Sequence, residues 1–341
     1  MVRFAVDHAT WCFLNISSVR NLDMRLRRQL LQLFLTLITL PVFAEEAALQ
    51  PVDSVIRMVS QTDITAQQRL AEQYRAEEPV DGYKKGFLQT ASVSAGWLSG
   101  LSGSQLNSNF IELSVKTAIP LGSFEHIMGV TPSFRTDFIE AAPGVDAPSE
   151  LHQAGVSFVV PHKINERWSA LAIVAPAVRS DFTTSDDALR IFGMALLTWQ
   201  AKPDRLAVSF GALYPDRADL PILPAIGLKW TPNKKTIYDI RFPESRFSWR
   251  LAKDGCHSET WAYMSGGFGG STWAVTRADG SHDQLSLKDI RLLFGAERKF
   301  DGGSRMFAEF GLAFSRTLEY EATQTEQTFG NAIVIQAGLT Y

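Results

Sequence analysis

The sequence predicts an all-β protein, a closed antiparallel transmembrane β-barrel of about 12–14 strands, preceded by a short N-terminal leader that is helical or disordered. From residue 86 onward, apolar and polar residues alternate in short segments separated by polar turns. The chain ends in AIVIQAGLTY, with Ile333, Ile335, Ala337, Leu339 and Tyr341 on one face of an extended strand. An unpaired terminal strand of this kind promotes aggregation, and barrel closure against the first strand removes that edge.

The N-terminus reads as an export signal. We expect translation to start at Met24, because residues 1–23 show none of the features of an export signal. Residues 24–28 are basic, residues 30–41 are apolar, and Val42-Phe43-Ala44 has the small-residue ending that signal peptidase recognises. We therefore expect a signal peptide over residues 24–44. A membrane anchor is the alternative, but the apolar run is shorter than the ~20 residues that a bilayer requires.

Composition limits the classes of function. Charged residues make up 20% of the chain and its net charge is −3, which does not indicate a nucleic-acid partner. Removal of residues 1–44 takes away five basic and two acidic residues, which leaves 28 basic, 34 acidic and a net charge of −6. The 2 cysteines, Cys12 and Cys256, lie in the extreme N-terminus and a predicted turn, so we expect no structural disulfide.

Residues 45–85 differ from the rest of the mature chain. Thr65-Ala66-Gln67-Gln68 resembles a helix capping box, and the following segment is rich in helix formers up to Pro79. We expect either a periplasmic helix or plug, or a short solvated leader. The pattern leaves both open.

Alternation defines the strands in residues 86–341. If the short pair around FPES is an irregular excursion, about twelve strands remain, and otherwise there are about fourteen. The predicted strands cover residues 87–98, 107–119, 127–138, 151–160, 168–180, 188–200, 205–214, 222–231, 236–242, 246–251, 259–275, 285–299, 304–319 and 329–341.

The phase of the alternation favours a membrane barrel over a soluble sandwich. Leu206, Val208 and Phe210 share one face of their strand, while Ala207 and Ser209 share the other. A soluble sandwich would carry a richly charged outer face, whereas here the second face is mostly small or weakly polar. Transmembrane barrels place the apolar face toward lipid and the smaller, more polar face toward the lumen.

Aromatic residues and connections indicate the membrane orientation. Tryptophans near the strand ends predict two interfacial girdles, with Trp97 and Trp273 at one end and Trp168, Trp199, Trp230, Trp249 and Trp261 at the other. Short basic turns such as TPNKK alternate with longer acidic loops such as EYEATQTEQ. Outer-membrane barrels have short periplasmic turns and long external loops, so we expect a Gram-negative outer membrane location with both termini in the periplasm.

Four segments resemble a known family: PSFRTDFIEAAPGVDAPSEL, RWSALAIVAPAVRSDF, LPAIGLKWTPN and GGSTWAVTRADG. Together they are similar to a domain-of-unknown-function family of Gram-negative outer-membrane β-barrels, from about residue 90 to the end. The resemblance implies a barrel and an outer-membrane address, and it supplies no reaction. The terminal strand also resembles the signal that the outer-membrane assembly machinery reads, which implies that machinery and outer-membrane lipids as partners. The oligomeric state stays open.

The sequence predicts no catalytic residues, no metal site and no cofactor, and we expect that the protein is not an enzyme. Ser281-His282-Asp283 contains the residue types of a catalytic triad, but neighbours on an extended chain point to opposite faces. HExxH, GxSxG and Walker A patterns are absent from the sequence. Acidic loop residues, among them Asp146, Asp216 and Asp219, offer oxygen ligands for divalent cations, but their spacing fits no known site and a solvated face is the alternative.

Charged residues on the small-residue face are the candidate site, because charge facing lipid is costly. We expect a lumen constriction or binding site, with Arg135/Asp137 and Arg179/Asp181 sharing a spacing of two near the external rim. The leading functional prediction is a channel for passive passage or uptake of small solutes. The alternatives are a closed barrel with a structural or surface-binding role, in which these charges neutralise one another, and, least favoured, a lipid-modifying enzyme. The candidate lumen residues are Glu112, Lys116, Arg135, Asp137, Arg179, Asp181 and Arg190.

Overall fold

A computed structural model of the chain describes residues 80, 82–84, 86–101, 106–122, 127–216 and 222–341. The expected signal peptide and most of the expected leader lie outside these residues. In the described part of the chain, no helix is long and apolar enough to cross a membrane. The strands are β1 Leu88–Gly100, β2 Leu106–Pro120, β3 Ile127–Ala141, β4 Glu150–Lys163, β5 Trp168–Ser180, β6 Leu189–Lys202, β7 Leu206–Tyr214, β8 Leu223–Asn233, β9 Thr236–Arg241, β10 Glu244–Asp254, β11 Ser258–Thr276, β12 His282–Phe300, β13 Arg305–Tyr320, β14 Thr325–Phe329 and β15 Ala332–Thr340.

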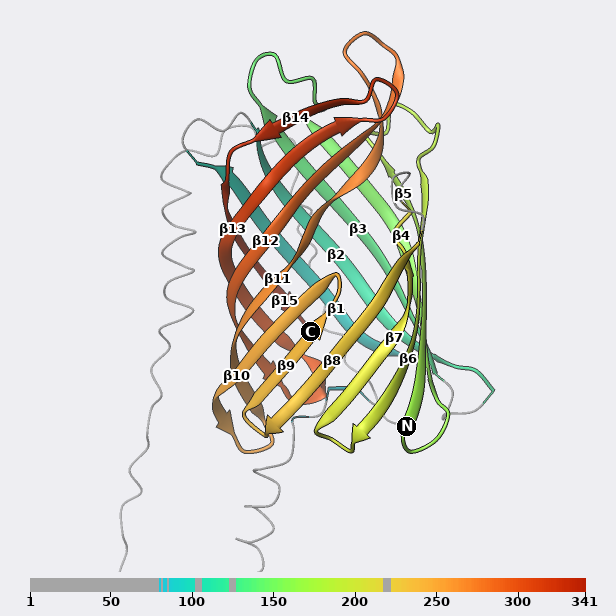
Figure 1. The fold of residues 1–341 in the computed structure, drawn as a ribbon, viewed down its shortest axis with the longest axis vertical. Helices are drawn as coiled ribbons and strands as arrows, with labels where there is room; N and C mark the ends of the chain where they lie inside the picture. The colour runs from blue at the N-terminus through green and yellow to red at the C-terminus, as the bar shows by residue number, and fades with distance from the viewer. Residues whose placement is uncertain (1–79, 81, 85, 102–105, 123–126, 217–221) are drawn as a thin grey trace, which may run out of the picture. The chain divides into compact units, whose positions relative to one another are not determined.

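The strands form one antiparallel sheet that closes on itself (Figure 1). Each strand from β1 to β13 pairs with the next, and β15 pairs with both β13 and β1. Because β14 and β15 lie against consecutive stretches of β13, they share one place in the wall, and the described strands form a 14-stranded barrel. The predicted fold class is confirmed, and the segment around FPES forms the regular hairpin β9–β10.

Closure explains the apolar C-terminal segment. Ile335 of β15 lies between Phe310 of β13 and Trp97 of β1, so both edges of the last strand are paired. The backbone of Tyr341 also exchanges two hydrogen bonds with Ala91, of 2.8 and 2.9 Å. The terminus is therefore held by the first strand, as the alternation predicted.

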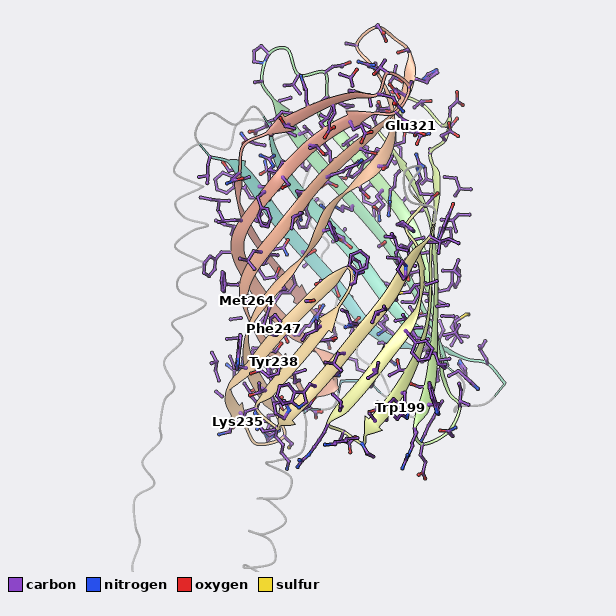
Figure 2. All side chains as sticks on the ribbon, in the orientation of Figure 1. Trp199, Lys235, Tyr238, Phe247, Met264 and Glu321 are labelled. Atoms are coloured by element: carbon purple, nitrogen blue, oxygen red, sulfur yellow. The ribbon has the colours of Figure 1, made fainter. Side chains whose placement is uncertain are left out.

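The outer face of the barrel is apolar. On β8, Ile226 and Trp230 on the outer face are 65% and 46% exposed. Ala225, on the inner face of the same strand, is 3% exposed. On β13, Phe310 is 64% exposed, whereas the adjacent Glu309 faces the interior. Figure 2 shows side chains projecting from the wall along its height, with Lys235 near one end and Glu321 near the other. An exposed apolar band on a closed barrel has the character of an outer-membrane β-barrel.

Two tryptophans depart from the predicted girdles. Trp261 and Trp273 are 5% and 4% exposed, so the interfacial prediction is wrong for both. Both lie on the lumen face of β11, where Trp261 donates a hydrogen bond of 2.8 Å to Glu259. Position near a strand end does not reveal which face a ring occupies, and here the phase of the strand decides it.

The wall is uneven in height. In Figure 1 the β9–β10 hairpin ends about half-way up, while β11, β12 and β13 continue to the upper end. Pairing of β11 with β10 stops where Gly267 meets Glu244, and β11 next meets Ser180 of β5 through Ala274. Beyond the β9–β10 turn, β11 therefore approaches β5 directly. We call the end with this contact the outer end.

Candidate functional site

A row of polar side chains crosses the inner face of four neighbouring strands. The register pairs Glu112 of β2 with Arg135 of β3, Arg135 with Gln153 of β4, and Gln153 with Arg179 of β5. Arg190 lies on the same lumen face of the next strand, β6. Side chains on one face of a sheet repeat every second residue, so the small-residue phase of these strands brings the row together.

Within this row, Arg135 is fully neutralised. Its Nε and Nη2 atoms donate to the two carboxylate oxygens of Asp137 at 2.8 and 2.6 Å, and its Nη1 lies 3.6 Å from Glu112. The guanidinium group also lies 3.8 Å from the centroid of the Phe110 ring. Two-point pairing fixes the planar group more firmly than a single charge contact does. The spacing of two along β3 thus produces a tight ion pair rather than a free charge.

Arg179 and Arg190 are bound differently. Arg179 Nε donates to the amide oxygen of Gln153 at 2.9 Å, and Arg190 Nη2 donates to the amide oxygen of Gln284. Among the described residues, neither guanidinium group forms an ion pair with a carboxylate. The positive charge of the row is therefore concentrated at β5 and β6.

Asp181 lies at the outer end instead of in the row. Its carboxylate accepts hydrogen bonds from the Thr276 and Thr183 amides, each of 2.9 Å, and from the Thr183 hydroxyl at 2.8 Å. It therefore joins the end of β5 to the end of β11. Burial acts to raise the pKa of Asp181, but these hydrogen bonds outweigh it and lower that pKa. Of the two Arg–Asp pairs suggested by the spacing, the structure brings together only Arg135 and Asp137.

Lys116 is the remaining candidate. It lies two lumen positions beyond Glu112 on β2, toward the end of the barrel with short turns, opposite Thr90 of β1. Its Nζ atom is 5.9 Å from the centroid of the Tyr83 ring. Lys116 is thus separated from the row and belongs to the region near the chain termini.

The opposite wall is also polar and mostly paired. Arg291 donates to both oxygens of Asp289 at 2.7 and 2.9 Å, and these residues share a spacing of two on β12. Nearby, Glu309 accepts hydrogen bonds from the Tyr263 hydroxyl and the Gln336 amide. Tyr263 was not predicted as a candidate, although its lumen position on β11 follows from the alternation that also places Trp261.

Arg246 extends this network and was not predicted as a candidate. Its Nη2 lies 2.8 Å from the Glu297 carboxylate, and its guanidinium carbon lies 3.5 Å from the centroid of the Tyr263 ring. Lys299 also approaches Glu297, at 3.1 Å. The alternation on β10 assigns Arg246 to the lumen face, but its partner on β12 depends on register, which the sequence does not show.

The two polar walls enclose a cavity of about 300 Å³. Glu112, Arg135 and Gln153 line one side of it, and Asp289 and Arg291 line the other. Charged rings that line a narrow passage can favour one sign of ion over the other. The arrangement therefore suits contact with small polar or charged solutes.

An apolar cluster forms the outer wall of this cavity. It was not predicted, because alternation alone does not show that the outer ends of six strands converge. Leu151, Val275 and Leu285 are fully buried within it, and Leu106, Ile139 and Trp273 also line the cavity. The outer cluster consists of Leu106, Ile139, Leu151, Trp273, Val275, Leu285, Leu318 and Tyr320.

Above the outer cluster, charged loop residues are paired with one another. Arg277 lies 3.1 Å from Asp146 and 3.4 Å from Asp283, and the Tyr320 hydroxyl donates to the Asp146 backbone oxygen at 2.6 Å. The Asp146 carboxylate is therefore already paired with the Arg277 guanidinium group. Across the described residues, no group of three or more acidic, histidine or cysteine side chains is arranged to hold a metal ion. Asp219 lies outside them.

The Ser281-His282-Asp283 segment is not a triad. The Ser281 hydroxyl donates to Asp279 at 2.6 Å, the His282 ring lies beside Thr276, and Asp283 pairs with Arg277. The three side chains therefore have three separate partners, as expected for neighbours on an extended segment.

Comparison with protein families gives one match. Residues 140–339, more than half of the chain, match a family described as "Domain of unknown function (DUF6268)". The chain belongs to the DUF6268 family. The match covers the region from the end of β3 to the end of β15. It confirms the predicted membership of a domain-of-unknown-function family of outer-membrane barrels.

Solved structures similar to this DUF6268 protein are distant from it. The KdgM porin in complex with disordered oligogalacturonate is 9% identical, with a TM-score of 0.33, and the match covers 74% of this chain and 98% of that one. An outer membrane channel from Pseudomonas putida F1 is 12% identical, with a TM-score of 0.38 and coverages of 77% and 99%. The TodX monoaromatic hydrocarbon channel deltaS2 mutant is 8% identical, with a TM-score of 0.38 and coverages of 74% and 88%. No curated protein matches the sequence.

Proposed function

We propose that this DUF6268 protein is an outer-membrane channel for the passive passage or uptake of small polar solutes. The observation that carries the proposal is the cavity of about 300 Å³ between two charged walls, inside a barrel whose outer face is apolar. A lumen lined by Arg135, Arg291 and their carboxylates offers hydrogen bonds in place of the water that a polar solute leaves behind.

A closed barrel with a structural or surface-binding role is the second candidate. Two observations favour it: the outer cluster forms the outer wall of the cavity, and Arg135 and Arg291 are already neutralised by Asp137 and Asp289. In this alternative the charges serve to hold the wall together, and the outer loops, such as residues 141–148, contact a partner.

We propose that the short turns and both ends of the barrel chain face the periplasm. The turns at 203–205, 234–235 and 255–257 have two or three residues, whereas the outer loops at 142–149 and 181–188 have eight. Short turns on the periplasmic side and longer external loops are the rule in outer-membrane barrels. The apolar band would then contact lipid, and β15 with the following Tyr341 would be the segment that the assembly machinery reads.

Single-channel recording in a planar bilayer tests the channel proposal. The mature chain, residues 45–341, is compared with a variant that lacks residues 45–79 and so keeps the contact of Lys84 with the Tyr341 ring, 3.8 Å from its centroid. Stepwise conductance from the mature chain supports an open channel. Conductance only from the shortened variant makes the leader a plug. Silence from both, with folding verified by circular dichroism, rejects the channel and favours the closed barrel.

A further inference from the structure

Two neighbouring lumen arginines, Arg179 and Arg190, differ from Arg135, Arg246 and Arg291 in the groups that they contact. Arg135, Arg246 and Arg291 each contact a carboxylate at 2.6 to 2.8 Å. Arg179 and Arg190, on adjacent strands, instead use neutral amide oxygens from Gln153 and Gln284. An amide fixes the position of a guanidinium group but does not neutralise its charge.

Arg190 is almost entirely removed from solvent, with 9% of its surface exposed. Its Nε–H group is buried and has no hydrogen-bond partner among the described residues. Burial of a donor without an acceptor is costly, and it is costlier when the donor carries charge. An acceptor from outside the described protein would remove this cost.

Arg179 increases the local excess of positive charge. It lies close enough to Arg190 and Arg135 for their charges to repel it, and Asp216 is near enough to attract it. Among the described residues, Asp216 forms no ion pair with Arg179, and its carboxylate instead accepts the Ile191 amide at 2.5 Å. Two like charges held together in a partly dry interior favour uptake of a counterion.

We infer that Arg179 and Arg190 form a binding site for a small oxyanion in the lumen, with a carboxylate or phosphate group as the ligand. The planar guanidinium fork donates two parallel hydrogen bonds to either group, which ammonium groups do not do. Gln153 lines the cavity and holds Arg179, so the site adjoins the cavity wall. In the proposed channel this site would favour anionic solutes, and this consequence rests on the proposed function, although the binding itself does not.

Isothermal titration calorimetry of the folded, detergent-solubilised mature chain tests the inference directly. Sodium acetate and inorganic phosphate serve as separate probes of carboxylate and phosphate binding, with sodium chloride as the reference anion. We expect saturable binding of at least one oxyanion, weakened by about tenfold or more in Arg179→Gln and in Arg190→Gln. Arg190→Lys retains the positive charge but lacks the planar guanidinium group that donates two parallel hydrogen bonds, so we expect it to weaken oxyanion binding as well.

Arg305→Gln is the matched control, because it removes one positive charge at the opposite end of the barrel, where Arg305 pairs in register with Thr340. Neither variant in the site leaves a carboxylate unpaired, so both are expected to fold, which circular dichroism verifies. Absence of saturable oxyanion binding in the parent chain, or equal affinity in the parent, Arg179→Gln and Arg190→Gln, overturns the site. Oxyanion binding without conductance in the bilayer supports the site and rejects the channel. Conductance without oxyanion binding supports the channel and rejects the site.

Discussion

At the scale of single residues, the difference between paired and unpaired arginines leads to a stability prediction. Arg135→Gln leaves the Asp137 carboxylate, 9% exposed, without its two-point partner. We expect a loss of about 2 to 3 kcal/mol in the free energy of unfolding, slightly below the usual cost of breaking a buried pair because Arg135 keeps some solvent contact. Urea unfolding of the refolded barrel, followed by tryptophan fluorescence, measures this loss.

Arg179→Gln is the control for that prediction. It removes the same type of side chain from the same row, but its partner is the neutral Gln153. We expect it to leave the free energy of unfolding nearly unchanged, and the double variant Arg135→Gln/Asp137→Asn to recover part of the lost stability. Equal destabilisation by Arg135→Gln and Arg179→Gln would show that the ion pair has no special role.

The phase of a strand indicates which face of the wall a side chain occupies, but not what it contacts there. Arg135 and Asp137 are two apart on one strand, so their pairing follows from local spacing. The contact of Arg190 with Gln284 joins β6 to β12, and the contact of Asp181 with Thr276 joins β5 to β11. These depend on register and on the course of the strand ends, which alternation does not encode.

At the scale of elements, the backbone conformation of β11 requires a glycine at position 270. Its φ is +89°, and a Cβ atom there would lie 2.0 Å from the Leu287 carbonyl oxygen. A side chain at a positive φ is strained, and this one would also push β11 away from β12. We therefore expect Gly270→Ala to destabilise the outer part of the β11–β12 hairpin by about 1 to 3 kcal/mol.

Gly266→Ala is the matched control, since it lies in the same glycine-rich segment and its nearest neighbour would be 3.7 Å away, an ordinary contact. Urea unfolding of the two variants compares them, and hydrogen exchange locates the affected segment. If both substitutions have the same effect, the strained backbone at Gly270 is not the cause.

Asp181 predicts a pH dependence for the contact between β5 and β11. Its pKa is lowered from the ordinary value of 3.8, so the stabilisation is fully present above that value and is lost as the pH falls through the lower pKa of the folded state. We expect Asp181→Asn to expose the Thr276 amide to faster hydrogen exchange at pH 7. Below pH 3.8, the ratio of exchange rates in the variant and the parent should fall toward one.

Hydrogen exchange with mass spectrometry on residues 270–276 measures this ratio, and comparison at one pH cancels the intrinsic pH dependence of exchange. Asp279→Asn, which changes an exposed carboxylate in the adjacent turn that binds Ser281, is the control and should leave these residues unaffected. If the ratio of exchange rates in the variant and the parent stays constant from pH 7 to pH 3, the Asp181 carboxylate does not stabilise the contact between β5 and β11.

At the scale of the whole molecule, the sequence predicted the barrel well because every strand carries its own two-residue period. The predicted segments match the observed strands, including β9–β10, except that the short strand β14 was not predicted, and the closure by β15 follows from the terminal alternation. The outer cluster was missed for a different reason. In this cluster Leu151 of β4 lies with Trp273 of β11, and these strands come near one another where β11 runs on beyond β10 to reach β5, the neighbour of β4.

The outer cluster determines how far the cavity reaches toward the outer end. Trp273 belongs to the cluster and lines the cavity, so Trp273→Ala removes a large ring from the shared wall. If solutes pass this wall, we expect a larger single-channel conductance from the variant in a planar bilayer. Leu318→Ala is the control, since Leu318 packs in the cluster without lining the cavity. Both substitutions should cost about 2 to 5 kcal/mol of stability, but only the first should raise conductance. An increase in both would mean that general loosening of the outer end, not the ring of Trp273, controls passage.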